Sequence, residues 1–238
     1  MERIIEGSRL PNGRIMGWVY LLYFLTATAG GFLINRVVAT DHAATITNLL
    51  AHEPTYRAGF AFGLVGNVVY VALTVLFYRL LKPVNPTLSL LMASASLIGC
   101  TTQIVAGLLQ LAPLVILRDR QLLAAFPIGQ LQAAALVSLR IYSQAFHISF
   151  VLFAVLDFTL GYLIFRSTFL PRFIGVLMMV AGAFAAIFLY PPLAVALQSF
   201  VIPVAGLPEA VLMLWLIVKG VNAAPREIVG SSRGALIA

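Results

Sequence analysis

Two carboxylates lie inside apolar stretches of this sequence, where little water is expected. Glu209 lies within VIPVAGLPEAVLMLWLIVKG (201–220), and Asp157 lies within AFHISFVLFAVLDFTLGYLIF (145–165). A charge at the centre of a bilayer costs about 2.5–3.5 kcal/mol on insertion scales, so acids at such positions are functional candidates. Without a cationic partner, burial and the like charge nearby favour the neutral form. We therefore expect at least one of the two acids to be protonated at neutral pH when no ligand is bound.

Amide side chains accompany these acids at a similar depth. Asn67 and Gln103 lie near the centres of two other apolar stretches, and Gln110 follows on the same helical face as Gln103. Four helices would thus surround a polar centre, while the first and fifth stretches, which offer nothing more polar than Thr at that level, would be peripheral. The predicted ligand site consists of Asn67, Gln103, Gln110, Gln144, His147, Asp157 and Glu209. Of these, Gln144 and His147 would lead to the site from the outer surface.

Three functions remain open for this polar centre. The first is a membrane protein that binds or transports a small ligand, a cation or protons. The second is an intramembrane enzyme that uses Asp157 or Glu209 as acid–base on a lipid or quinone, and the third is a non-catalytic scaffold or subunit. Buried polar groups can also serve as interhelical contacts worth about 0.6–2 kcal/mol each. No motif identifies a catalytic residue or a cofactor, so we favour the first function.

The sequence predicts no metal site. His42 and His52 lie in the first outer loop, but their spacing matches no standard ligand pair. The single cysteine, Cys100, lies in an apolar stretch, which excludes an intramolecular disulfide and a cysteine cluster.

The composition explains where these residues must lie. The chain has 238 residues, of which 61% are hydrophobic and 10% charged, with a mean hydropathy of +1.01. Soluble domains carry about 25% charged residues, so lipid is the expected solvent and partner of this chain. The formal net charge of +7 would suggest nucleic acid in a soluble protein. Here the basic residues lie between apolar stretches, so we expect them to set membrane orientation and no nucleic acid to bind.

Apolar stretches of about 20 residues cross a bilayer, and helices satisfy their backbone groups there. Six occur, at about 15–34, 58–77, 88–114, 145–165, 173–190 and 201–219. We predict an all-α fold, a single integral membrane domain over 1–238 with about six transmembrane helices. A short amphipathic surface helix is expected within 41–52, with Asp41 as its N-cap. The fourth transmembrane helix should begin near Gly129 and extend beyond the bilayer.

The distribution of basic residues predicts the orientation. Most of the 15 lysines and arginines lie in the N-terminal segment, in the two short hairpins after the second and fourth stretches, and in the tail over 220–238. The positive-inside rule therefore places both termini and this basic tail in the cytoplasm. Aromatic residues that we assign to the same interface include Trp18, Tyr20, Phe77, Phe165 and Trp215.

Proline and glycine suggest how the helices pack. Pro203 and Pro208 lie in the last stretch, where Pro208 should kink the helix just before Glu209. Gly59 and Gly63, four residues apart, permit a close helix contact. We interpret this contact as intramolecular, with a homo-oligomer interface as the alternative.

Several segments resemble a family of bacterial multi-pass proteins catalogued only as a domain of unknown function. They are DHAATITNLLAHEPTYRAGF (41–60), YRLLKPVN (78–85), GYLIFRSTFLPRFIGVLM (161–178) and PEAVLMLWLIVKG (208–220), and the resemblance covers roughly residues 10–220. It implies a bacterial inner (plasma) membrane protein with about six helices, and it supplies no activity. Members of that family often carry an acid in the second helix, whereas this chain has Asn67 there.

Overall fold

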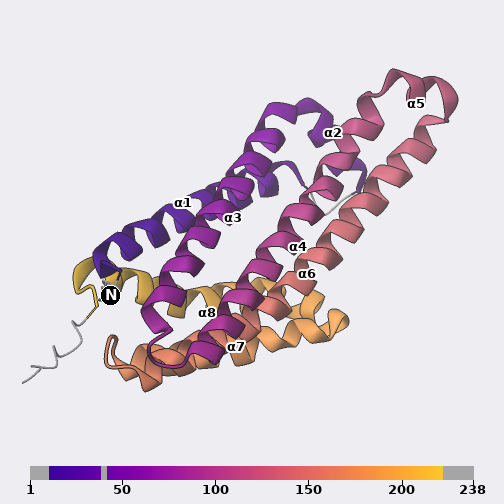
Figure 1. The fold of residues 1–238 in the computed structure, drawn as a ribbon. Helices are drawn as coiled ribbons and strands as arrows, with labels where there is room; N and C mark the ends of the chain where they lie inside the picture. The colour runs from indigo at the N-terminus through magenta and orange to yellow at the C-terminus, as the bar shows by residue number, and fades with distance from the viewer. Residues whose placement is uncertain (1–10, 39–41, 222–238) are drawn as a thin grey trace, which may run out of the picture.

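The computed structural model describes residues 11–38 and 42–221, and this part of the chain is helical, as expected (Figure 1). Six helices are long and apolar enough to cross a membrane. Asp41 and the tail beyond Val221 lie outside the described residues, so the predicted N-cap and basic tail are not described. The helices are α1 (Gly13–Val37), α2 (His42–Ala51), α3 (Glu53–Leu81), α4 (Pro86–Arg118), α5 (Arg120–Ala125), α6 (Ile128–Arg166), α7 (Arg172–Ala185), the short 3₁₀ helix η1 (Ala186–Leu189) and α8 (Pro191–Val218).

The six long helices pack as a ring. Around it, α1 contacts α3, α3 contacts α4, α4 contacts α6, α6 contacts α7 and α7 contacts α8, which returns to α1. We call the end where α1 begins and α8 ends the terminal end, and the end that carries α2 and α5 the distal end (Figure 1). The short helix expected within 41–52 is α2, which packs on α1 and α3.

Local sequence signals explain where several helices start and stop. Asn85 caps α4 by accepting a hydrogen bond from the backbone N–H of Leu88, at 2.9 Å, and a proline follows at the first helical position. The long α6 begins at Ile128 and confirms that the fourth transmembrane helix extends well beyond its apolar core. We expected the sixth stretch to begin near residue 201, but α8 begins at Pro191. Proline is tolerated in the first turn of a helix because its missing N–H has no partner there.

Glycines bring neighbouring helices into close contact. A Cβ atom at Gly30 of α1 would lie 2.9 Å from the backbone nitrogen of Gly63 and 3.0 Å from the carbonyl oxygen of Gly59. The predicted contact at Gly59 and Gly63 is therefore intramolecular, between α3 and α1. On the other side of the ring, a Cβ at Gly161 of α6 would lie 2.6 Å from the carbonyl oxygen of Gly175 on α7. Only glycine permits such close backbone approach.

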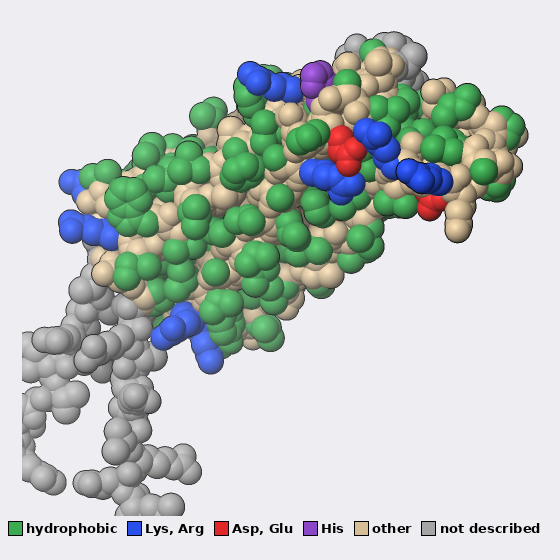
Figure 2. Space-filling view, turned by 90° about the horizontal axis from the view of Figure 1, so that it is seen from above, with side chains coloured by type: hydrophobic (Ala, Val, Ile, Leu, Met, Phe, Trp, Pro, Cys, Tyr) green, Lys and Arg blue, Asp and Glu red, His purple; other side chains and the backbone are tan. Residues whose placement is uncertain are grey.

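The surface is apolar between two charged ends. In the view from above, lysine and arginine side chains gather at the two ends, and the surface between them is largely hydrophobic (Figure 2). At the distal end Glu53 accepts from Arg57 at 2.8 Å and from Arg118 at 3.2 Å. A belt of exposed apolar side chains between charged ends is the surface expected of a multi-pass membrane protein.

Candidate functional site

A cavity of about 610 Å³ lies inside the ring, with most of its wall on α1, α3, α4, α6 and α8. The cavity is lined by most of the predicted ligand site, namely Asn67, Gln103, Gln110, His147, Asp157 and Glu209. The structure does not bring Gln144 to the cavity, since its side chain is exposed and does not line it. Residues three apart on a helix still differ by about 60° in direction, so Gln144 lies beyond the edge of the face that buries His147.

Asp157 is a buried polar group of the cavity. Its side chain is 4% exposed, and its Oδ1 atom has no hydrogen-bond partner in the described residues. Glu209 of α8 lines the same cavity, close enough to Asp157 for the two carboxyl groups to interact electrostatically. At 1.5 Å per residue, each acid lies about 14 Å along its helix from the terminal end, which is about half the thickness of a bilayer.

The first helix contributes directly to this site, so the expectation that it is peripheral is wrong. The hydroxyl of Tyr20 on α1 donates to Oε2 of Glu209 at 3.0 Å. Tyr20 is 1% exposed, so its assignment to the membrane interface is also wrong. Tyr23 and Phe24 of α1 line the cavity as well, whereas α7 contributes only Ala185 to the described lining. The hydropathy pattern predicts how deep a residue lies in the membrane but not which way its side chain points. Tyrosine is also common at membrane interfaces, so its type alone favoured that assignment.

The side chains of two amides of the site, Gln103 and Asn67, already have partners within the protein. The side chain of Gln103 on α4 donates to the Ser149 hydroxyl on α6 at 3.0 Å, and Ser149 donates to the Phe146 carbonyl at 2.6 Å. Asn67 donates to the Gly63 carbonyl of its own helix at 3.1 Å. Gln103 thus acts as an interhelical contact, of the kind that buried amides make in membrane proteins. Asp157 has no such structural partner at Oδ1.

Aromatic rings form much of the remaining wall, a feature that the sequence analysis missed. Tyr23 and Tyr70 have ring centroids 4.5 Å apart, and Tyr70 meets Phe153 edge-on at 5.7 Å. Aromatic side chains from α1, α3 and α6 line the cavity, among them Tyr23, Phe60, Tyr70, Tyr142, Phe150 and Phe153. Aromatic residues occur throughout this chain, so composition and spacing gave no signal for this particular set.

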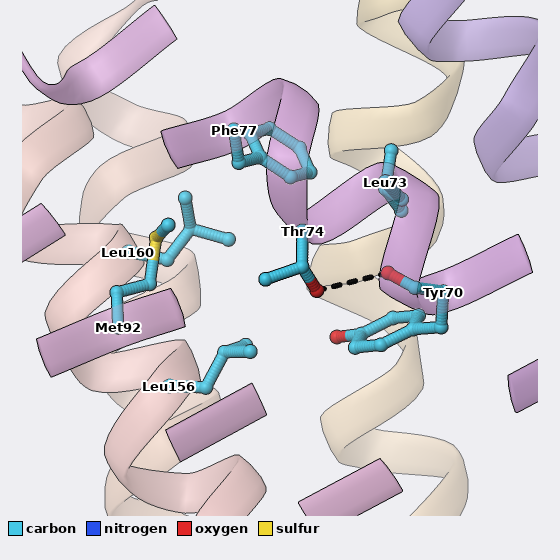
Figure 3. A pocket seen from close by; sticks show the side chains of 7 residues that line it. All are labelled: Tyr70, Leu73, Thr74, Phe77, Met92, Leu156 and Leu160. Atoms are coloured by element: carbon cyan, nitrogen blue, oxygen red, sulfur yellow. Dashed lines mark hydrogen bonds between the residues drawn. The ribbon is translucent and has the colours of Figure 1, made fainter. Parts of the chain in front are cut away.

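The cavity ends at Tyr70 on the side of the terminal end. Beyond it, α3, α4 and α6 enclose a void of only about 10 Å³, lined by Tyr70 and by apolar side chains that include Leu73, Met92 and Leu156 (Figure 3). In the same view the Thr74 hydroxyl donates to the Tyr70 carbonyl at 2.8 Å, and the hydroxyls of Thr74 and Ser96 on α4 lie 2.6 Å apart in a second hydrogen bond. This void is about the size of one water molecule, so α3, α4 and α6 pack closely against one another there.

The donor set of the cavity differs from that of a metal centre. Within the described residues, no three His, Cys, Asp or Glu side chains lie close enough together to hold a metal ion. His52 is exposed near the distal end, and the side chain of His42 lies outside what the structure describes. None of the described residues that line the cavity is lysine or arginine, so the two acids face aromatic and amide groups.

Six membrane-capable helices around a central cavity define a multi-pass helical membrane protein. Within that class, the chain belongs to the family described as a domain of unknown function (DUF4386), whose model matches residues 15–220. The family resemblance inferred from the sequence is thereby confirmed. Comparison with curated proteins found no match, and comparison with solved structures found none either.

Proposed function

We propose that this protein binds or transports a small ligand or a cation in the cavity, at the level of Asp157 and Glu209. The observation that carries the proposal is the Oδ1 atom of Asp157, which is buried beside an open space and has no hydrogen-bond partner among residues 11–38 and 42–221. A carboxyl group in that position is costly unless a ligand or a proton satisfies it. The volume of about 610 Å³ lies in the range of pockets that hold small molecules.

Two glycines permit a test that leaves the helix packing intact. Gly63 and Gly206 line the cavity, and a Cβ atom at either position would meet no atom within 4 Å. Gly206→Leu and, separately, Gly63→Leu should therefore fill the cavity from α8 and from α3. Gly129→Leu is the matched control, because Gly129 is exposed at the start of α6 and also has open space around it.

The measurement is a ligand screen on the purified full chain, by native mass spectrometry and thermal shift. We expect a ligand that stabilises the natural protein and the Gly129→Leu variant. The Gly63→Leu, Gly206→Leu and Asp157→Asn variants should lose this stabilisation. A ligand that binds all variants alike would place its site elsewhere and overturn the proposal, as would a broad screen that finds no ligand at all. Turnover of a lipid or quinone that depends on Asp157 would instead favour the intramembrane enzyme.

We also propose that the protein lies in the bacterial inner membrane with both termini in the cytoplasm, so that the distal end faces outward. The excess of lysine and arginine at the terminal end supports this orientation. Green fluorescent protein fused after Ala238 should fluoresce, because it folds in the cytoplasm. A C-terminal alkaline phosphatase fusion should be inactive, and the reverse pair of results would contradict the orientation.

A further inference from the structure

The charge of the cavity wall indicates the charge of its occupant. Asp157 and Glu209 are its two acids, and the described lining holds no lysine or arginine to oppose them. Glu209 accepts a hydrogen bond from Tyr20, while Oδ1 of the buried Asp157 accepts none from the part of the chain that the structure describes. A cation would satisfy these groups. A phospholipid headgroup would bring a phosphate that finds no basic partner here, so a group with positive charge alone fits better.

The aromatic wall indicates an organic cation. Tyr23, Tyr70 and Phe153 follow one another at centroid distances of 4.5 and 5.7 Å near the two acids. Aromatic faces attract ammonium groups, including those with alkyl substituents. A bare metal ion prefers a shell of six or more oxygens, and it would leave most of a 610 Å³ cavity empty.

The arrangement of α1 and α8 indicates where the occupant enters. At the terminal end the two helices touch, since a Cβ atom at Gly17 would lie 2.6 Å from the backbone nitrogen of Ile217. Toward the distal end they diverge, while α8 stays close to η1 and α6 (Figure 1). The part of α1 that lines the cavity lies on this divergent side, where Thr28, Gly31 and Asn35 are exposed.

We infer, resting on the proposed function, that the ligand is an amphiphilic organic cation that enters between α1 and α8. Its ammonium group lies between Asp157 and Glu209 against the rings of Tyr23, Tyr70 and Phe153. Its apolar part extends along α1 toward the divergent side and the surrounding lipid.

Three probes with the same eight-carbon chain separate charge from shape. Octyltrimethylammonium carries a lone positive charge, octylphosphocholine adds a phosphate as in a lipid headgroup, and octanol is neutral. Equilibrium binding is measured on the full chain in nanodiscs, with binding to empty nanodiscs subtracted. We expect saturable binding of octyltrimethylammonium, with at least tenfold weaker affinity in the Asp157→Asn and Glu209→Gln variants. Octanol and octylphosphocholine should show no saturable binding.

Chain length and matched variants complete the test. Affinity should rise from ethyl- to butyl- to octyltrimethylammonium, by up to about fourfold for each added CH₂ that leaves water. Gly206→Leu should abolish binding and Gly129→Leu should not change it. Saturable octylphosphocholine binding would point to a lipid headgroup and overturn the inference. So would saturable octanol binding, cation binding that both acid variants retain, or the absence of binding by all three probes. The proposed function survives these failures if another ligand is blocked by Gly63→Leu and Gly206→Leu.

Discussion

At the scale of single residues, Asp157 differs from Asn67, Gln103 and Glu209. Gln103 and Asn67 make hydrogen bonds that hold helices or satisfy their own helix, and Glu209 has the Tyr20 hydroxyl. Asp157 is 4% exposed, yet its Oδ1 atom has no partner in the described residues. A buried polar atom without a hydrogen bond lowers the stability of the folded protein. Residues that bind a ligand commonly carry such a stability cost.

The stability of an Asp157 variant therefore distinguishes a ligand group from a structural contact. Without ligand, we expect Asp157→Leu to raise the free energy of unfolding by about 1–3 kcal/mol, because it removes a buried, unsatisfied polar atom. Unfolding of the purified protein in mixed micelles, followed by circular dichroism, measures this change. Ser149→Ala is the comparison, since it removes the acceptor of Gln103 and should lower stability. A loss of stability in Asp157→Leu equal to that of Ser149→Ala would show that Asp157 has a structural role.

The residue scale also shows how far the sequence predicts the site. The position of each polar residue along its apolar stretch was enough to predict a set that lines one cavity, namely Asp157, Glu209, Asn67 and Gln103. The prediction works because helices of similar length align their centres in a bilayer. The direction of each side chain was not predictable, since it depends on how each helix is rotated against its neighbours. Gln144, which was expected to lead toward the cavity from the outer surface, does not line it, and Tyr20, which was assigned to an interface, contacts Glu209.

At the scale of helices, glycine decides which pairs pack tightly and which leave space. The α6–α7 pair is joined through Gly161, Gly175 and Gly182, where an added Cβ would lie 2.6 Å from backbone atoms of the partner helix. The glycines of the cavity wall, Gly63 and Gly206, have no atom within 4 Å of an added Cβ. Glycine thus permits close helix packing between α6 and α7, and it leaves space for the cavity at α3 and α8.

A set of glycine-to-alanine variants tests this division. Gly161→Ala should lower the free energy of unfolding by about 1–3 kcal/mol, because its Cβ must push α7 away from α6. Gly31→Ala, which has no neighbour within 4 Å of the added Cβ, is the control and should be neutral or slightly stabilising. Thermal unfolding of both variants in the same detergent provides the measurement. Equal stability of the two variants would contradict the close α6–α7 contact.

The sequence predicted some helix boundaries better than others. The helix α4 begins at Pro86, close to the predicted start of the third stretch at residue 88, and the long α6 was expected from its helix-forming residues. The membrane-capable part of α8, Ser199–Val218, agrees with the predicted stretch, while the helix itself begins earlier, at Pro191. Proline is compatible with the first turn of a helix.

At the scale of the whole molecule, the bundle is hollow on one side of its centre and packed on the other. The cavity reaches from Asp157 and Glu209 toward Asn35 and Gln110 near the distal end. The terminal half is filled by an apolar core that includes Leu73, Phe77 and Leu160, with a void of only about 10 Å³. If the cavity holds a ligand as proposed, this asymmetry favours access from the distal side.

Thiol accessibility tests this asymmetry. In a Cys100→Ser background, a cysteine at Asn35 or Thr28 should react with a membrane-impermeant maleimide added to the distal side, because both residues line the cavity. A cysteine at Leu73, which is 1% exposed in the packed half, should stay unlabelled from either side. Labelling at Leu73 as fast as at Thr28 would show that the terminal half is open to water.

The depth of the two acids has an electrical consequence. A univalent cation that reaches Asp157 and Glu209 from the distal end crosses about half of the membrane, and moving one charge across 100 mV is worth about 2.3 kcal/mol. Half of that voltage drop changes the affinity about sevenfold. If the distal end faces outward, a negative interior draws the cation toward the two acids. The fraction of proteins with an occupied cavity would then rise with the membrane potential, even without any movement of the helices.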